Sequence, residues 1–140
     1  MQISHIAIYV DNLNRMDKFY EKYFGAKSKE IYFNPKTGLQ SYLLSFDDGC
    51  ILEIMTKPAL TKIENRLDTI GYNHIAICVG GKGEVDRITT WLKEEGHKII
   101  NYPHTAGDGC YESLILDPEN NLIEIRDYNY KSMSKRQDCA

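Results

Sequence analysis

The 140-residue sequence lacks the features that mark membrane, secreted and nucleic-acid-binding proteins. No apolar run approaches the roughly 20 residues that a membrane span needs, so no membrane association is expected. The N-terminal segment has neither the basic leader nor the long apolar core of a signal peptide, so a cytoplasmic location is expected. The formal net charge is −3, and without a basic surplus no nucleic-acid partner is expected.

Cysteine is scarce and scattered along the chain. Cys50, Cys78, Cys110 and Cys139 form no Cys-x-x-Cys pair and no zinc-finger spacing. A chain of this length can build its core without disulfides, so we expect buried or half-buried thiols. The sequence also contains no phosphate-binding loop, no Ser-His-Asp arrangement and no dinucleotide-binding fingerprint.

What the sequence does contain is an internal repeat. The segment HIAIYV at 5–10 recurs with one difference as HIAICV at 74–79, and LLSFDDGCILEI at 43–54 is echoed by LILDPENNLIEI at 114–125. Hydrophobic residues make up 42 % of the chain and charged residues 26 %, as in an ordinary globular protein. These observations predict a duplicated module.

Each half is expected to fold as a β-α-β-β-β module, which makes the fold class α+β. Alternation and helical spacing predict, in the first half, a strand over 1–10, a helix over 13–24 that Gly25 ends, and strands at 29–33, 40–46 and 50–55. In the second half they predict a strand at 73–79, a helix over 84–95, and strands at 98–102, 111–116 and 122–127. The expected modules are 1–56 and 73–128, with a linker at 57–72 and a polar tail at 129–140.

Two histidines and two glutamates occupy matching places in the two halves. In strands, alternate residues share a face, so His5 and His74 lie opposite the residues that pack on the helix, and Glu53 and Glu124 point the same way. Taken singly, each has an ordinary explanation as a surface histidine or an exposed strand glutamate. A carboxylate in an apolar strand is costly unless it is paired or metal-bound, and here the pattern occurs twice. Together the four residues predict a metal site.

The donor atoms of this set restrict the metal. No thiolate is included, which disfavours a soft structural zinc site. Two imidazole nitrogens and two carboxylate oxygens suit Zn²⁺, Ni²⁺, Co²⁺, Mn²⁺ or Fe²⁺ in five- or six-coordinate geometry. One or two positions would then stay open for water or for substrate oxygens, as in catalytic sites.

At these residues the sequence resembles the vicinal oxygen chelate superfamily, which includes glyoxalase I, extradiol dioxygenases, and fosfomycin and bleomycin resistance proteins. The resemblance covers 1–128 and rests on the segments SHIAIYV, FYEKYFG, CILEIM, YNHIAICV and LDPENNLIEI. It implies the glyoxalase/bleomycin resistance/dihydroxybiphenyl dioxygenase fold, in which two modules form one domain and their mixed sheets curl into a cup around the metal. It also implies a homodimer.

Within this superfamily the complete set of His5, Glu53, His74 and Glu124 is similar to that of glyoxalase I, or lactoylglutathione lyase. The resemblance implies a metal-dependent lyase that isomerises the hemithioacetal of a thiol and methylglyoxal, and so a role in methylglyoxal detoxification. The metal would act as a Lewis acid that stabilises a cis-enediolate from vicinal oxygens. A metal-bound glutamate would move the proton, with Glu124 the expected base and Glu53 the second choice.

One departure from the glyoxalase I pattern leaves the substrate open. Bacterial glyoxalase I has an arginine on its first strand that helps to hold the glutathione carboxylate, and here that place is Tyr9. Arg66 and Arg126 are the other candidates for holding such a carboxylate, so another thiol or a different vicinal-oxygen substrate is open. The alternatives are a thiol-transferring antibiotic-resistance enzyme, a dioxygenase-type enzyme, and a non-catalytic protein that binds a small molecule. Whether the metal site lies within one chain or is shared between two also stays open.

Overall fold

A computed structural model describes residues 3–62, 67 and 69–128. The chain divides into two compact units, Met1–Glu64 and Asn65–Ala140, and each contains one copy of the repeat. In each unit one helix accompanies one mixed sheet, so the predicted α+β class is confirmed. The tail predicted at 129–140 lies outside the described residues, and the union of both units in one domain stays a prediction. Neither of the two described helices has the length and apolar character required to cross a membrane.

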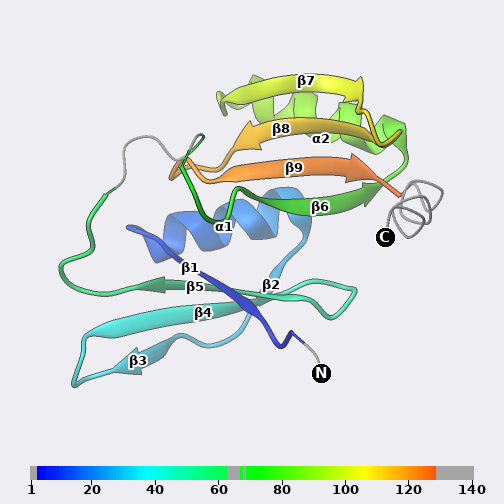
Figure 1. Cartoon of the computed structure of the whole chain (residues 1–140). Coiled ribbons are helices and arrows are strands. Elements are labelled where there is room, and N and C mark those ends of the chain that lie inside the picture. The colour runs from blue at the N-terminus through cyan, green and yellow to red at the C-terminus, as the bar shows by residue number, and fades with distance from the viewer. Residues whose placement is uncertain (1–2, 63–66, 68, 129–140) are drawn as a thin grey trace, which may run out of the picture. The chain divides into compact units, whose positions relative to one another are not determined.

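The first unit contains one helix and a five-stranded sheet (Figure 1). Its elements are β1 (Ile6–Tyr9), α1 (Leu13–Phe24), β2 (Lys27–Ser28), β3 (Tyr32–Asn34), β4 (Leu39–Ser45) and β5 (Ile51–Thr56). The strand order is β1-β5-β4-β2, with β3 also paired to β4, and only the pairing of β1 with β5 is parallel.

The single strand predicted at 29–33 is wrong, because two short strands stand there instead. Both pair with the same neighbour: β2 with the end of β4, and β3 with its start. The segment between them belongs to neither strand, so the edge of the sheet is interrupted.

The second unit repeats this architecture with four strands. Its elements are β6 (His74–Gly80), α2 (Lys82–Glu94), β7 (Ile99–Thr105), β8 (Tyr111–Leu116) and β9 (Leu122–Asp127). The order is β6-β9-β8-β7, with β6 parallel to β9 and the other pairs antiparallel. The helix begins two residues before the predicted start, because Gly81 occupies the N-cap position in an extended conformation.

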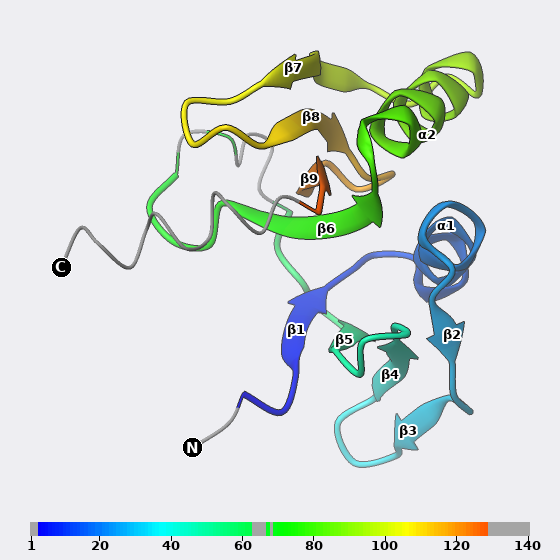
Figure 2. The same cartoon turned by 90° about the vertical axis from the view of Figure 1, so that its right-hand side faces the viewer.

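Each helix covers one face of its own sheet (Figure 2). In the first unit the buried side chains of α1 are Leu13, Met16, Phe19, Tyr20 and Tyr23, and the sheet contributes Leu44, Leu52 and Ile54. In the second unit α2 buries Val85, Ile88 and Leu92, and the sheet contributes Ile115, Ile123 and Ile125. A buried hydrogen bond of 2.7 Å between Thr89 Oγ1 and Ser113 Oγ also joins α2 to β8. Among the described residues, the opposite face of each sheet carries no helix of its own unit, and the predicted metal ligands lie there.

Candidate metal centre

In the first unit, strand register brings His5 and Glu53 together. The parallel pairing of β1 with β5 places Ala7 beside Glu53, and His5 precedes Ala7 by two residues on the same face. The neighbours of Glu53 along β5, Leu52 and Ile54, are buried in the core under α1. As a result His5 Nε2 lies 3.4 Å from Glu53 Oε2.

The second unit reproduces this arrangement. Ala76 stands beside Glu124 in the parallel pairing of β6 with β9, and His74 precedes Ala76 by two residues. The distance between His74 Nε2 and Glu124 Oε2 is again 3.4 Å. The repeat seen in the sequence is therefore a repeat of side-chain geometry, with one His–Glu pair in each unit.

A neighbouring side chain selects the tautomer of His74. The Asn73 amide oxygen lies 2.8 Å from His74 Nδ1, and because this oxygen only accepts hydrogen bonds, Nδ1 must donate. In the neutral ring, Nε2 then carries a lone pair and faces a carboxylate oxygen. His5 Nδ1 contacts Ser4 Oγ at the same distance of 2.8 Å, but the hydroxyl can donate or accept, so this contact does not fix the tautomer of His5. Two acceptors that face each other favour a cation between them.

The spacing within each pair fits ligands of a shared ion. Two ligand atoms that lie about 2.1 Å from one ion are separated by roughly 3.0 to 3.4 Å in octahedral to tetrahedral geometry. The oxygen Oε1 of Glu124 is buried and accepts no well-aligned hydrogen bond, although a guanidinium charge lies close to it. Nitrogen and oxygen donors with unused lone pairs are the set that divalent ions of the zinc and nickel kind accept.

A complete site needs more than one pair. Among the residues that the structure describes, no group of three or more His, Cys, Asp or Glu side chains could hold a metal ion. The structure thus brings His5 to Glu53 and His74 to Glu124, and the union of both pairs around one ion stays a prediction.

The two glutamates differ in their surroundings, and Arg126 causes the difference. Arg126 Nη1 lies 3.0 Å from Glu124 Oε1, and Nη2 lies 3.3 Å from Asp108 Oδ2 and donates to Cys110 Sγ. Burial lowers the pKa of the Arg126 guanidinium, but the hydrogen bond to Cys110 and the charge of Glu124 outweigh it and raise the pKa well above its usual range. Arg126, a candidate for holding a substrate carboxylate, is therefore already engaged by protein groups, and Arg66 lies outside the described residues.

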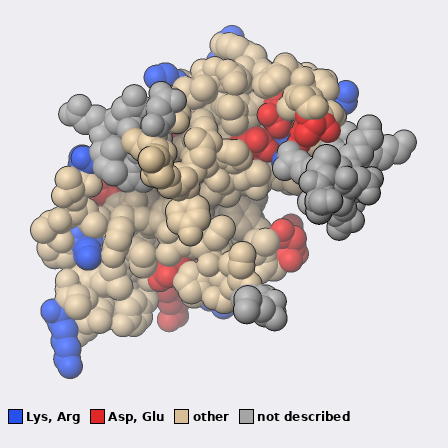
Figure 3. All heavy atoms as spheres, in the orientation of Figure 1, with Lys and Arg blue, Asp and Glu red and all other residues tan. Residues whose placement is uncertain are grey.

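Two further titratable groups lie beside Arg126 in the strand register. Glu112 on β8 and Cys78 on β6 are its partners on the two neighbouring strands. Burial, and then the charge of Glu124, raises the pKa of Glu112. Partial desolvation also raises the pKa of the Cys78 thiol, although the residue is exposed overall, and the charge of Arg126 offsets this only in part. Figure 3 shows acidic side chains gathered toward the right-hand end of the second unit.

Sequence reasoning missed two parts of this environment. Lys57 Nζ lies 5.1 Å from the ring centroid of Tyr9, which places a cation beside the residue that replaces the expected arginine. The contact of Asp108 with Arg126 was also missed, because it depends on the geometry of the turn between β7 and β8. Spacing along the chain carried no signal for either.

The expectation for the thiols is met only in part. Cys110 is buried, but Cys50 and Cys78 are exposed, so the prediction of buried or half-buried thiols is wrong for these two. None of the three forms a disulfide, and Cys139 lies outside the described residues.

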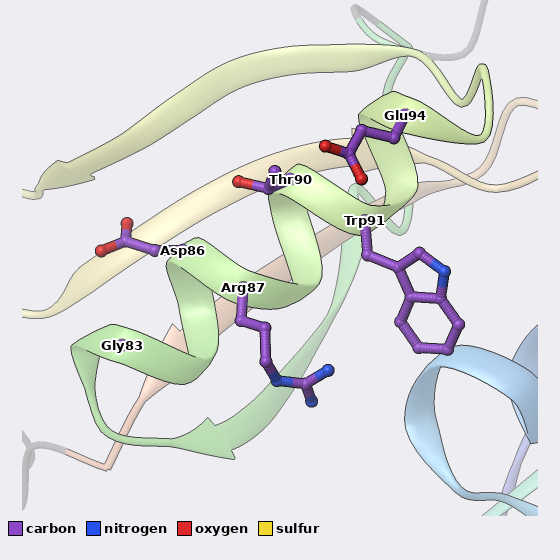
Figure 4. A pocket seen from close by; sticks show the side chains of 6 residues that line it. All are labelled: Gly83, Asp86, Arg87, Thr90, Trp91 and Glu94. Atoms are coloured by element: carbon purple, nitrogen blue, oxygen red, sulfur yellow. The ribbon is translucent and has the colours of Figure 1, made fainter.

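A depression along α2 is separate from the His–Glu pairs. Its lining side chains all belong to that helix (Figure 4): Gly83, Asp86, Arg87, Thr90, Trp91 and Glu94. They lie on the side of α2 that faces away from the buried Val85, Ile88 and Leu92. The depression contains neither His74 nor Glu124, so it adds nothing to the metal site.

Comparisons with known proteins agree with this architecture. The family model of the Glyoxalase/Bleomycin resistance protein/Dioxygenase superfamily matches residues 2–125. The protein YqjT of Bacillus subtilis (strain 168) is 23 % identical over 124 residues, which cover 86 % of this chain and 94 % of YqjT. The trypanothione-dependent glyoxalase I of Leishmania major has a TM-score of 0.75 at 21 % identity, over 99 % of this chain and 94 % of that chain. The fosfomycin resistance protein FosX of Listeria monocytogenes, solved with Mn(II) and sulfate, has a TM-score of 0.72 at 21 % identity, over 95 % and 97 % of the two chains.

Proposed function

Because the chain belongs to the Glyoxalase/Bleomycin resistance protein/Dioxygenase superfamily, we propose that it is a metal-dependent lyase of the glyoxalase I type. Its substrate would be the hemithioacetal of a thiol and methylglyoxal, and its role the detoxification of methylglyoxal. The observation that carries this proposal is the identical His–Glu pair in each unit, with 3.4 Å between Nε2 and Oε2 in both. A chain that only sequesters a small molecule has no need for such a pair, and still less for two.

The four ligands would be His5, Glu53, His74 and Glu124, and the ion Zn²⁺, Ni²⁺, Co²⁺, Mn²⁺ or Fe²⁺. A divalent ion bound there would supply Lewis-acid chemistry, by offsetting the negative charge that develops on two vicinal oxygens. The two imidazoles are neutral ligands and the two carboxylates anionic, so the protein neutralises the ion. Open coordination positions would be left for the substrate.

The protein's own groups would move the proton. The reaction transfers hydrogen between two adjacent carbons, so it needs one base that takes the proton from the first carbon and returns it to the second. Glu124 and Glu53 are the candidates, because both carboxylates belong to the ligand set and lie on the open faces of their sheets. Sequence reasoning ranks Glu124 first.

A screen of hemithioacetals tests the proposed function. Metal-free protein would be loaded in turn with each of the five ions and assayed with methylglyoxal and several thiols, glutathione included. We expect thioester formation with at least one thiol and loss of activity on chelation. His74→Ala, prepared and loaded in the same way, is the matched control and should be inactive. Turnover of an epoxide antibiotic with a thiol, and of no hemithioacetal, would move the proposal to the antibiotic-resistance enzymes of this superfamily.

We also propose that the protein works as a homodimer in the cytoplasm. The resemblance to the family supports the dimer, and the two modules that complete one site can come from one chain or from two. Sedimentation velocity at micromolar concentration should therefore give twice the mass of one chain. A single species with the mass of one chain would contradict the dimer and leave the proposed reaction standing.

A further inference from the structure

The two glutamates are equivalent in the repeat but are not held alike. Two residues after Glu124 stands Arg126, whose Nη1 lies 3.0 Å from Glu124 Oε1. Two residues after Glu53 stands Met55, which has no hydrogen-bond donor in its side chain. Among the described residues, Glu53 has a single polar contact, with His5. The repeat therefore presents one anchored carboxylate and one that is tied only through its histidine.

Arg126 is itself fixed from its far side. Its Nη2 contacts Asp108 Oδ2 at 3.3 Å and donates to Cys110 Sγ. Asp108 is in turn held by the turn between β7 and β8, where its Oδ1 accepts a hydrogen bond of 3.0 Å from the Cys110 amide. Only 17 % of the Arg126 side chain is exposed. The guanidinium is thus a built-in part of the second unit rather than a mobile surface group.

This anchoring limits what Glu124 can do. With Oε1 against Arg126 and Oε2 toward His74, both oxygens of Glu124 are assigned, and its side chain is only 10 % exposed. Rotation of the Glu124 side chain would separate its carboxylate from the Arg126 guanidinium where little water is available to solvate either charge, which is costly. Glu53 is 20 % exposed, and its second oxygen contacts no cationic group among the described residues. Glu53 can therefore turn without breaking an ion pair to arginine.

From this asymmetry, and resting on the proposed function, we infer that Arg126 is a positioning residue that keeps Glu124 as a fixed metal ligand and leaves Glu53 to move the proton. The Glu53 carboxylate takes the proton from the carbon that bears the hydroxyl and the thiol sulfur. The electron pair of that C–H bond becomes the carbon–carbon double bond of an enediolate, and the π pair of the neighbouring carbonyl moves onto its oxygen. The same carboxyl then returns the proton to the neighbouring carbon, while the hydroxyl proton of the first carbon ends on the oxygen of the second. Atoms and electrons balance within the substrate, so no oxidant or reductant is needed.

The test begins with metal affinity, which needs no substrate. The dissociation constant of Co²⁺ would be measured by competition for the parent, Glu53→Gln and Glu124→Gln. A fixed ligand contributes more to affinity than one that leaves the ion, so Glu124→Gln should weaken binding on the order of 10- to 100-fold, and Glu53→Gln by less than about tenfold. Equal weakening by the two substitutions would overturn the inference.

Variants at Arg126 make the test specific to positioning. Repeating both glutamine substitutions in an Arg126→Met background, which copies Met55, should bring their Co²⁺ affinities to within about threefold of each other. Arg126→Lys should keep most of the difference, and Met55→Leu, a control at the matching place in the first unit, should keep all of it. A difference that survives Arg126→Met would contradict the role of Arg126. If Arg126→Met does not fold, the Co²⁺ affinities of the two glutamine variants in the parent and in the Arg126→Lys background still test the inference.

Turnover then separates the two proposals. With saturating metal, Glu53→Gln should lose on the order of 10²- to 10⁴-fold in kcat, and Glu124→Gln should lose far less. The Glu53→Gln/Arg126→Met double variant should regain part of the loss, because Glu124 is then able to turn. The opposite ranking of the two glutamines would overturn the inference and keep the function. A parent that binds metal yet turns over no hemithioacetal would overturn the function, and the affinities would still judge Arg126 as a positioning residue.

Discussion

The orientation of a single imidazole ring decides which of its nitrogens meets a metal ion. In His74, Nδ1 donates a hydrogen bond of 2.8 Å to the Asn73 amide oxygen, so in the neutral ring the Nε2 lone pair faces Glu124. In His5 the hydroxyl of Ser4 occupies the corresponding place. Both neighbours immediately precede the histidine in sequence, but only the Asn73 amide oxygen, which accepts and does not donate, fixes which ring nitrogen carries the proton.

Substitution of Asn73 should therefore weaken metal binding without removing a ligand. In Asn73→Ala the ring loses the acceptor that fixes its tautomer, and we expect the dissociation constant of Zn²⁺ to rise on the order of 10- to 100-fold. Competition with a chromophoric chelator measures it, and Asn73→Asp, which keeps an acceptor, is the matched control. Parent-like affinity in Asn73→Ala would show that the amide does not orient His74.

Glu112 should make the stability of the metal-free protein depend on pH. Burial and the charge of Glu124 raise its pKa in the folded state, so the folded protein binds this proton more tightly than the unfolded chain does. The ionised form then costs stability, and the cost appears as pH rises from about 4, near the ordinary glutamate pKa, toward neutrality. Glu112→Gln removes the cost, so its gain in unfolding free energy over the parent should be larger at pH 7 than at pH 4. Urea titrations with chelator present measure both, and a gain that is flat or falls with pH would contradict the account.

The two modules share one architecture, but their helices begin at different kinds of N-cap. Helix α1 begins at a side-chain cap, in which Asn12 Oδ1 accepts from the Arg15 amide at 3.0 Å, and it ends at Gly25 in the left-handed conformation, with φ at 66°. Helix α2 begins at Gly81, where no side-chain cap exists. The two helices nevertheless cover equivalent faces of their sheets, and the predicted metal ligands lie on the opposite faces.

Loss of the cap on α1 should destabilise the protein by a predictable amount. Asn12→Ala leaves the Arg15 amide without its acceptor, and we expect the free energy of unfolding to fall by about 1 kcal/mol. Asn12→Asp keeps an acceptor and should stay close to the parent. Denaturant titration of both variants checks this, and equal stability of Asn12→Ala and the parent would mean that the cap contributes nothing.

The sequence predicted the elements that follow from periodicity and repetition. The helix at 13–24 matches α1 because apolar spacing and Gly25 define it, and the His–Glu pairs follow from alternation once the strands are known. Sequence reasoning missed the split into β2 and β3. The split depends on which residues pair with the two ends of β4, and local periodicity does not encode that pairing. It also could not connect Arg126 with Asp108, because their contact requires the register of β8 against β9 and the path of a turn.

At the scale of the whole molecule, the proposed ligand set takes one His–Glu pair from each unit. One pair offers one nitrogen and one oxygen, which is too few for a stable divalent site, whereas two pairs provide four ligands. Under the proposed function, the recurrence of a histidine and a glutamate together follows from the need of one ion for both pairs. The proposed chemistry depends on both pairs binding the same ion.

The stoichiometry of metal binding tests that dependence most directly. Metal-free protein would be dialysed against Zn²⁺ or Ni²⁺ and the bound ion counted per chain by elemental analysis, for the parent, His5→Ala and His74→Ala. We expect about one ion per chain in the parent and most of it lost in either single variant, because each histidine serves the same site. Two ions per chain, with one lost in each variant, would mean two separate sites, and no bound ion in the parent would contradict the metal centre altogether.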